Sequence, residues 1–269
     1  MSAHAAILGV REVDAEGSIA LVSEEPDPPY NRPPLSKALW KGKTVESIGS
    51  RVYPAALARF LMVYFREKGV EVLAGEAVTG VGRTGERSTV TTRSGRQIQA
   101  DGVVAGIGIM PNTALAESAG LKVSNGIEVD ELLRTSHPDA YAAGDVANFY
   151  SAALGRRMRV EHEDNANTMG RQAGRNMAGA GEPYRHLPAF YSDLFDLGYE
   201  AVGEVDAGLE TVEDWKVPNR EGVVYYLKDG RVRGVLLWNV WDQVEAARTL
   251  GASPGPFLPR DLVGRIGGR

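Results

Sequence analysis

The chain has 269 residues, 43% of them hydrophobic and 24% charged, which is the composition of an ordinary folded protein with room for two or three domains. Its net charge of −5 gives no electrostatic reason to expect nucleic acid or an anionic membrane surface as a partner. It contains no cysteine, which excludes structural disulfides, cysteine-bound metal, iron–sulfur clusters and a redox-active pair of thiols.

The N-terminal segment, MSAHAAILGV, lacks the pattern of a signal or transit peptide, and no apolar run approaches the roughly 20 residues of a membrane span. We therefore expect a cytoplasmic protein. Two short apolar runs, His4–Leu8 and Ile19–Val22, predict β-strands. Only ten residues separate them, and they contain no G-x-G-x-x-G. A parallel crossover needs at least ~10–12 residues including its helix, so a hairpin fits these residues at least as well.

The segment from Pro26 to Lys37, PDPPYNRPPLSK, predicts a rigid surface loop, because its five prolines exclude a helix or a central strand. Arg32 and Lys37 are its basic residues. Such loops are common at protein surfaces, so these two residues alone do not establish a binding function.

An amphipathic helix is predicted from Pro54 to Lys68, with apolar residues at helical spacing that are expected to lie in the core. Short strands joined by glycine turns follow, and then a buried strand from Gly102 to Ile109 and a short helix that ends at Gly120. The expected short strands are 70–73, 77–81, 88–92 and 96–100.

The segment TSHPDAYAAGDVANF, from Thr135 to Phe149, predicts a short extended stretch over 140–143 that ends in Gly144-Asp145 and turns into a helix. Gly144 permits a tight turn, and the small residues before it allow a ligand to approach the backbone. Asp145 can accept a hydrogen bond from a sugar or polyol hydroxyl. The same pattern also occurs as a plain turn in many α/β folds, so the residues alone leave both interpretations open.

Glu161, His162 and Glu163 precede a helix of small residues predicted from Asn165 to Met177. An extended Glu-His-Glu places alternate side chains on opposite faces, which is poor geometry for chelation, so no metal site is expected. Beyond a linker at 183–188, four strands predict a small antiparallel α+β domain with a hairpin turn at Lys228-Asp229-Gly230. The expected strands are 201–205, 211–215, 222–228 and 232–239, followed by a helix over 241–250 and a ragged Gly/Pro-rich tail.

Five stretches together resemble the apoptosis-inducing-factor-like branch of the FAD/NAD(P)-dependent oxidoreductases, a branch that also includes bacterial proteins close to ferredoxin reductases. The stretches are PYNRPPLSK, the Thr135–Asp145 segment, RRMRVEHEDNANTMGRQAGRNM, GYEAVGEV and VLLWNVWDQ. The resemblance implies an α/β fold that retains parts of the three-layer dinucleotide-binding architecture. It assigns 1–48 and 109–186 to a discontinuous FAD-binding domain, 49–108 to a remnant of an NAD-binding domain, and 187–269 to the antiparallel C-terminal domain.

The resemblance implies FAD and NAD(P)H as cofactors. It gives Lys37 and His162 a part in the reaction, Lys37 by stabilising negative charge as hydride reaches the flavin and His162 by positioning the ring or moving a proton. Relatives carry tryptophan where this chain has Tyr191, which could stack less extensively. The residues implied in cofactor binding are Glu24, Arg32, Lys37, Gly108, Gly144, Asp145, Glu161, His162, Glu163, Tyr191, Glu200 and Asn239.

The family's two glycine-rich phosphate loops have no counterpart in this sequence. The leading hypothesis is an FAD-dependent NAD(P)H oxidoreductase that passes electrons to a small redox protein, a quinone or oxygen, with homodimers expected from the resemblance. Without the loops, the alternative is a truncated or minimised noncatalytic relative that acts as a scaffold or interaction module. A third hypothesis is that the chain is part of a longer gene product.

Overall fold

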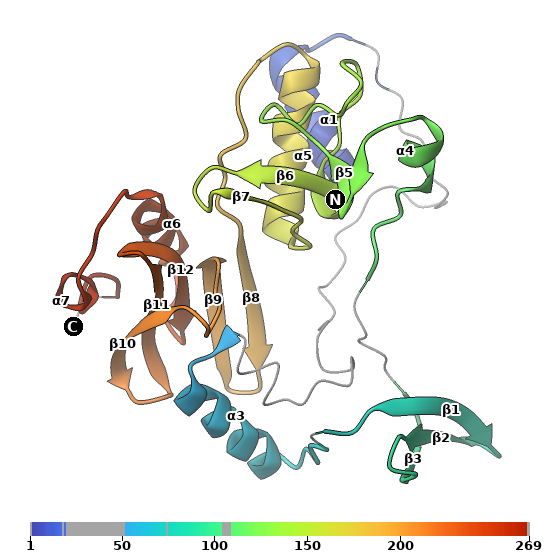
Figure 1. The fold of residues 1–269 in the computed structure, drawn as a ribbon, viewed down its shortest axis with the longest axis vertical. Helices are drawn as coiled ribbons and strands as arrows, with labels where there is room; N and C mark the ends of the chain where they lie inside the picture. The colour runs from blue at the N-terminus through green and yellow to red at the C-terminus, as the bar shows by residue number, and fades with distance from the viewer. Residues whose placement is uncertain (1, 18, 20–51, 74, 104–108, 268–269) are drawn as a thin grey trace.

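The computed structural model describes residues 2–17, 19, 52–73, 75–103 and 109–267. It is a mixed α/β structure, as the sequence predicts. Its elements form three groups: an N-terminal body around two long helices, a small three-stranded flap, and an antiparallel C-terminal domain (Figure 1).

The N-terminal body combines the first helix with residues from about 110 to 177. Its four short strands pair in the order β4-β5-β6-β7, and β5 and β6 run parallel. Met169 and Ala173 of helix α5 pack on Phe149 of the sheet and form its core with Val129 and Leu133. The elements are α1 (Ser2–Val13), α4 (Ala114–Ser118), β4 (Val123–Ser124), β5 (Gly126–Glu128), the 3-10 turn η1 (Gly144–Val146), β6 (Ala147–Ser151), β7 (Arg156–Met158) and α5 (Glu163–Met177).

Helix α1 lies along α5, and this contact corrects the expectation of a strand at 4–8. The two helices approach so closely that glycine is required on both. A Cβ on Gly9 would lie 1.9 Å from the carbonyl oxygen of Arg171, and one on Gly174 would lie 1.9 Å from that of Ala6. Glu12 of α1 also forms ion pairs with Arg171 and Arg175 of α5. The apolar run at 4–8 is therefore one face of a helix that needs a partner helix.

The flap contains three of the strands expected between 77 and 100, paired antiparallel in the order β1-β2-β3. They are β1 (Val78–Thr84), β2 (Arg87–Thr92) and β3 (Gln97–Ala100). The strand expected at 70–73 is wrong, because the described residues there form no ladder. The buried strand expected at 102–109 is also wrong at its ends, where Val103 and Ile109 are exposed.

The C-terminal domain is built on a five-stranded antiparallel sheet in the order β10-β11-β12-β9-β8. Asp229 and Gly230 both have positive φ, 52° and 71°, and form the tight hairpin turn predicted between β11 and β12. The sequence did not predict the first strand, β8. The strands are β8 (Ala189–Leu194), β9 (Leu197–Gly203), β10 (Glu210–Val217), β11 (Glu221–Lys228) and β12 (Arg231–Trp238).

Both faces of this sheet are covered, because the central strands β11 and β12 are buried along most of their length and successive residues point to opposite faces. Helix α6 (Val244–Ala252) covers one face together with the chain end, and it begins later than the expected 241. Helix α3 (Ala55–Glu67), expected from the sequence, covers the other face through Leu57, Leu61 and Tyr64. Its aromatic residues are therefore core residues, as predicted. Helix α3 falls within the range assigned to the NAD-binding remnant, yet it packs on the C-terminal domain.

Polar contacts fasten the end of α3 to the sheet. Lys68 and the hydroxyl of Tyr64 both contact the carboxylate of Asp196 in the β8–β9 turn. These two hydrogen bonds, that from Lys68 first, hold the pKa of Asp196 at about 2. The Arg220 guanidinium lies 4.9 Å from the ring centroid of Phe60.

The tail after Gly251 is ordered and packed, which corrects the expectation of a ragged end. Pro259 begins a short helix, α7 (Pro259–Leu262), and Asp261 accepts a hydrogen bond from the backbone N–H of Leu258 at its start. Leu262 and Ile266 are buried in the α6 face of the sheet. In the part of the chain that the structure describes, no helix has the length and apolar character that crossing a membrane requires.

Candidate functional site

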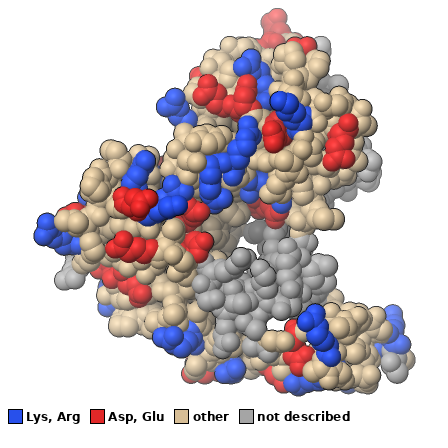
Figure 2. All heavy atoms as spheres, viewed as in Figure 1, with Lys and Arg blue, Asp and Glu red and all other residues tan. Residues whose placement is uncertain are grey.

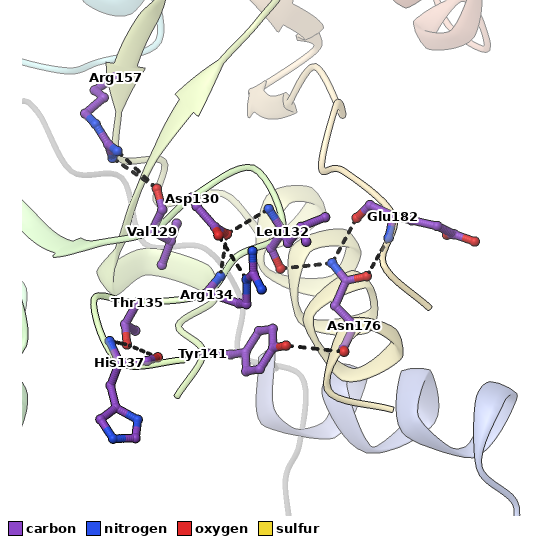
Figure 3. A network of polar contacts seen from close by, with 10 residues as sticks. All are labelled: Val129, Asp130, Leu132, Arg134, Thr135, His137, Tyr141, Arg157, Asn176 and Glu182. Carbon is purple, nitrogen blue, oxygen red and sulfur yellow. Dashed lines mark hydrogen bonds and ion pairs between the residues drawn. The ribbon is translucent and has the colours of Figure 1, made fainter. Parts of the chain in front are cut away.

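The segment that leads to Gly144-Asp145 is tied to the far end of helix α5 (Figure 3). The side-chain amide of Asn176 donates to the carbonyls of Leu132 and Glu182, each at 2.9 Å, and its oxygen accepts from the Glu182 N–H at 2.9 Å. The Tyr141 hydroxyl donates to the Asn176 carbonyl at 3.3 Å. Asp130 closes the intervening turn by accepting from two backbone N–H groups. The start of the 140–143 stretch therefore has a fixed position relative to α5.

Gly144 makes the turn that the sequence predicted, with φ of 79°. Its N–H donates to the sulfur of Met169 on α5 at 3.3 Å, which holds the turn against the helix. Asp145 follows within η1, and its side chain is exposed beside α5. The expected helix after Asp145 is wrong, because η1 is a single turn and the chain continues into strand β6.

Arg159 links Asp145 to the segment before α5. Its guanidinium donates to the Asp145 carbonyl at 2.9 Å and forms an ion pair with Glu161 at 2.7 Å, in which both side chains are largely buried. His162 is the N-cap residue of α5, and Glu163 already belongs to the first helical turn. The expectation that 161–163 is extended is therefore wrong at Glu163. Four of the predicted residues, Asp145, Glu161, His162 and Glu163, lie close together at this helix end.

The ring of His162 meets Phe190 of strand β8, with centroids 4.6 Å apart and planes inclined by 35°. Phe190 was not predicted as a site residue, although it is the neighbour of Tyr191. Successive residues of a strand point to opposite faces, so only one of the two can meet His162. A residue from the C-terminal domain therefore completes the site at the amino end of α5.

Tyr191 and Glu200 pair across β8 and β9, on the opposite face of the sheet from Phe190. Tyr191 is 53% exposed. Oε2 of Glu200 is buried and has no hydrogen-bond partner among the described residues. Burial, and next the charge of Asp242, raise the pKa of Glu200 above its ordinary value. A buried acceptor without a donor fits a site that receives a polar ligand.

Asn239 is engaged within the protein. Its side-chain oxygen accepts from the Gly198 N–H at 2.7 Å, and its amide donates to the Arg220 carbonyl at 2.9 Å. It has positive φ, 50°, and so terminates β12 while holding the β10–β11 turn. Its role in cofactor binding stays a prediction. Glu24, Arg32, Lys37 and Gly108 lie outside the described residues.

Asp164, next to Glu163, is a further charged residue of this helix end that the sequence did not single out. Burial acts to raise its pKa, but hydrogen bonds from His186 and Ala189 and the charge of Arg248 outweigh burial and hold the pKa below its ordinary value. A carboxyl group with a lowered pKa stabilises the fold above its unfolded pKa of about 4, and this stabilisation is lost as the pH falls through the folded value.

Acid is therefore expected to remove the contribution of Asp164 to stability. The difference in unfolding free energy between the wild type and Asp164→Asn should be largest near neutral pH and shrink below pH of about 4. Urea unfolding followed by circular dichroism at several pH values measures it. Asp139→Asn, at an exposed loop position, serves as the control. A difference for Asp164→Asn that stays constant with pH would contradict the assignment.

The described residues fit a flavin in three respects. An exposed carboxylate, Asp145, follows a positive-φ glycine, and His162 stands at the N-cap position of the adjacent helix. On the other face of the C-terminal sheet, Glu200 offers a buried oxygen that has no donor among the described residues. The arrangement can hold a polyol chain, position a flat ring and take up a hydrogen bond. These are features expected of a cofactor-binding site in the dinucleotide-dependent class of proteins.

Comparison with known proteins agrees with this class. Residues 44–170 match the model of the pyridine nucleotide-disulphide oxidoreductases, and residues 173–221 and 213–252 match that of the C-terminal domain of mitochondrion-associated apoptosis-inducing factor. The chain belongs to the pyridine nucleotide-disulphide oxidoreductases, in their apoptosis-inducing-factor-like branch.

Individual relatives show how much of the family the chain contains. It is 36% identical to apoptosis-inducing factor 1 of Dictyostelium discoideum over 75% of this chain and 41% of that protein. It is 38% identical to monodehydroascorbate reductase 3 of Arabidopsis thaliana over 70% of this chain and 44% of that protein. The chain thus spans less than half the length of these curated relatives.

Solved structures give the same result. The ferredoxin reductase of Rhodopseudomonas palustris is 31% identical with a TM-score of 0.64, covering 70% of this chain and 47% of that one. The reductase–putidaredoxin covalent complex gives 30% identity and a TM-score of 0.70, covering 78% of this chain and 51% of the matched chain. These neighbours support the fold expected from the resemblance.

Proposed function

We propose that this chain acts as an FAD-dependent NAD(P)H oxidoreductase that delivers electrons to a small redox protein in the cytoplasm. The observation that carries the proposal is the contact of the His162 and Phe190 rings at the amino end of α5, with Asp145 joined through Arg159 to the neighbouring Glu161. The family membership supports the general reaction. The similarity to a reductase captured with putidaredoxin supports a protein acceptor over a quinone or oxygen.

Bound FAD would supply the redox chemistry, by accepting a hydride from NAD(P)H and releasing electrons to the acceptor. Asp145 would accept hydrogen bonds from the ribityl hydroxyls. His162 and Phe190 would limit where the ring can lie and exclude water from one side of it. Glu200, with its raised pKa, would hold a proton or accept a hydrogen bond on the Tyr191 face.

A second candidate function is a noncatalytic interaction module, and one observation favours it. In the described part of the chain, only β5 and β6 form a parallel pair, whereas the C-terminal domain has a five-stranded sheet with both faces covered. A dinucleotide-binding domain is normally built on a larger parallel sheet. The complete unit here is therefore the C-terminal domain.

The visible absorption spectrum of the purified protein, before and after anaerobic NADH, distinguishes the two functions. Flavin bands that bleach support the oxidoreductase. A protein that stays colourless after incubation with FAD rules it out and leaves the interaction module.

Asp145→Asn is expected to raise the dissociation constant of FAD by about 10- to 100-fold, because a charged hydrogen bond contributes about 1.5–3 kcal/mol. Quenching of flavin fluorescence during titration measures the constant. Asp139→Asn, also exposed and in the same segment of chain, should leave it unchanged. Equal constants for both variants and the wild type would show that Asp145 does not bind the flavin.

A further inference from the structure

The first turn of α5 is fastened to the C-terminal domain by the carboxylate of Asp164. Oδ2 accepts from the backbone N–H of Ala189 at 2.8 Å and lies 2.7 Å from Nε2 of His186. Oδ1 accepts from the Arg248 guanidinium at 2.8 Å. Arg248 belongs to α6 and also donates to the Leu187 carbonyl at 3.1 Å. One half-buried side chain thus joins three segments.

The attachment point lies directly beside the candidate site. Asp164 comes two residues after His162, and Ala189 immediately precedes Phe190. The two rings that meet at 4.6 Å are therefore each next to one end of the Asp164–Ala189 hydrogen bond. A change in this bond is therefore expected to alter the separation of those rings.

A second polar contact joins the N-terminal body to the C-terminal domain, away from the His162 and Phe190 rings. Glu204 forms ion pairs with Arg156 of β7 at 2.9 Å and with Arg233 of β12 at 2.8 Å. Arg233 also donates to the Leu154 carbonyl at 2.6 Å. Acidic and basic side chains lie side by side over this junction on the face seen in Figure 2. The Glu204 contact can keep the parts together when Asp164 is changed.

We propose that Asp164 is a positioning residue, which holds the C-terminal domain through Ala189, His186 and Arg248 so that Phe190 stays against the His162 ring. Its effect on catalysis rests on the proposed oxidoreductase function, whereas its effect on the position of β8 does not. Asp164 touches neither the reacting atoms nor the proposed ring site, and it acts through its neighbours.

Asparagine at this position separates the roles of the two oxygens. The amide oxygen can replace Oδ2 and keep the Ala189 and His186 contacts, but an NH₂ group then faces the Arg248 guanidinium, and both are donors. If the amide flips, Arg248 keeps an acceptor and the Ala189 N–H loses its own. Either orientation removes at least one of the links.

Hydrogen–deuterium exchange is the first test, because it requires no flavin. In Asp164→Asn, the amides of Ala189 and Phe190 are expected to exchange at least tenfold faster than in the wild type, with β11 unchanged. Glu204→Gln is the matched control, since it weakens the same junction away from the rings and should leave these two amides within about twofold. Unchanged exchange in Asp164→Asn overturns the proposal.

Arg248→Lys keeps the positive charge but removes the planar fork, and it serves if Asp164→Asn fails to fold. It should also accelerate exchange at Ala189, by a smaller factor, and unchanged exchange in this folded variant overturns the proposal.

In protein that binds flavin, Asp164→Asn should lower kcat with NADH about tenfold and change KM less than twofold. Faster exchange with an unaltered kcat would overturn the positioning role in catalysis, and a colourless protein would count against the oxidoreductase function alone.

Discussion

Replacing Trp238 by alanine is expected to lower the free energy of unfolding by about 4 kcal/mol. Trp238 is fully buried between the C-terminal sheet and α3, with its ring stacked on Tyr199 at 5.8 Å and met edge-on by Tyr53. Its indole N–H donates to the Asn219 carbonyl at 3.1 Å. The substitution removes the largest side chain of this cluster and also one partner of that carbonyl, so the cavity and hydrogen-bond losses add.

Urea unfolding followed by far-ultraviolet circular dichroism measures the change. Trp241→Ala is the control, because Trp241 lies three residues along the chain and is 47% exposed. It should cost about 1 kcal/mol, for the contact of its ring with Gly198. Similar losses for both tryptophans would show that α3 does not cover this face of the sheet.

The strands of the C-terminal domain could be predicted because each carries its own pattern. Short, nearly continuous apolar runs mark β11 and β12, and Asp229-Gly230 marks the turn between them. The cover of each face could not be predicted in the same way. Helix α3 is recognisable as amphipathic from the spacing of its apolar residues. Its sequence does not show which sheet it covers, because that depends on contacts such as Tyr64 with Asp196, 132 residues apart.

The tail shows how a composition rule fails. Glycine and proline after residue 251 suggested an irregular end, and the helix there is only four residues long, too short for periodicity to reveal. Two apolar residues, Leu262 and Ile266, are enough to anchor the tail, because the α6 face of the sheet offers them a buried position. The sequence of the tail itself does not predict this buried position.

Some residues of the candidate site could be predicted from the sequence and others could not. Asp145 and His162 could be proposed from short motifs, and the structure brings them to one end of α5. Phe190 could have been found from strand alternation beside Tyr191, had β8 been recognised. Asp164, His186 and Arg248 could not, since their contacts join residues 22 and 84 positions apart and each alone is an ordinary surface charge.

The N-terminal segment was misread for a related reason. A short apolar run such as AAIL is compatible with either a strand or a helix, and the element it packs against decides between them. The partner is α5, whose Gly174 leaves room for the backbone of α1.

Gly174→Ala should therefore destabilise the protein, although helix propensity alone predicts the opposite. In a free helix, alanine is favoured over glycine by about 1 kcal/mol. Here the new Cβ would lie 1.9 Å from the Ala6 oxygen and 2.9 Å from the Val10 nitrogen, and both are backbone atoms that cannot rotate away. Overpacking of this kind costs about 3 kcal/mol, so the net effect is a loss of about 2 kcal/mol as α1 is pushed off α5.

Thermal unfolding measures the sign of this change, and limited proteolysis within 2–17 reports whether α1 has detached. Gly82→Ala is the control, because a Cβ there meets nothing within 4 Å. A Gly174→Ala protein that is more stable than the wild type and equally resistant to protease would mean that α1 does not rest on α5. Helix α5 would then be held by the β4–β7 sheet and, at its amino end, by the C-terminal domain, without a contribution from α1.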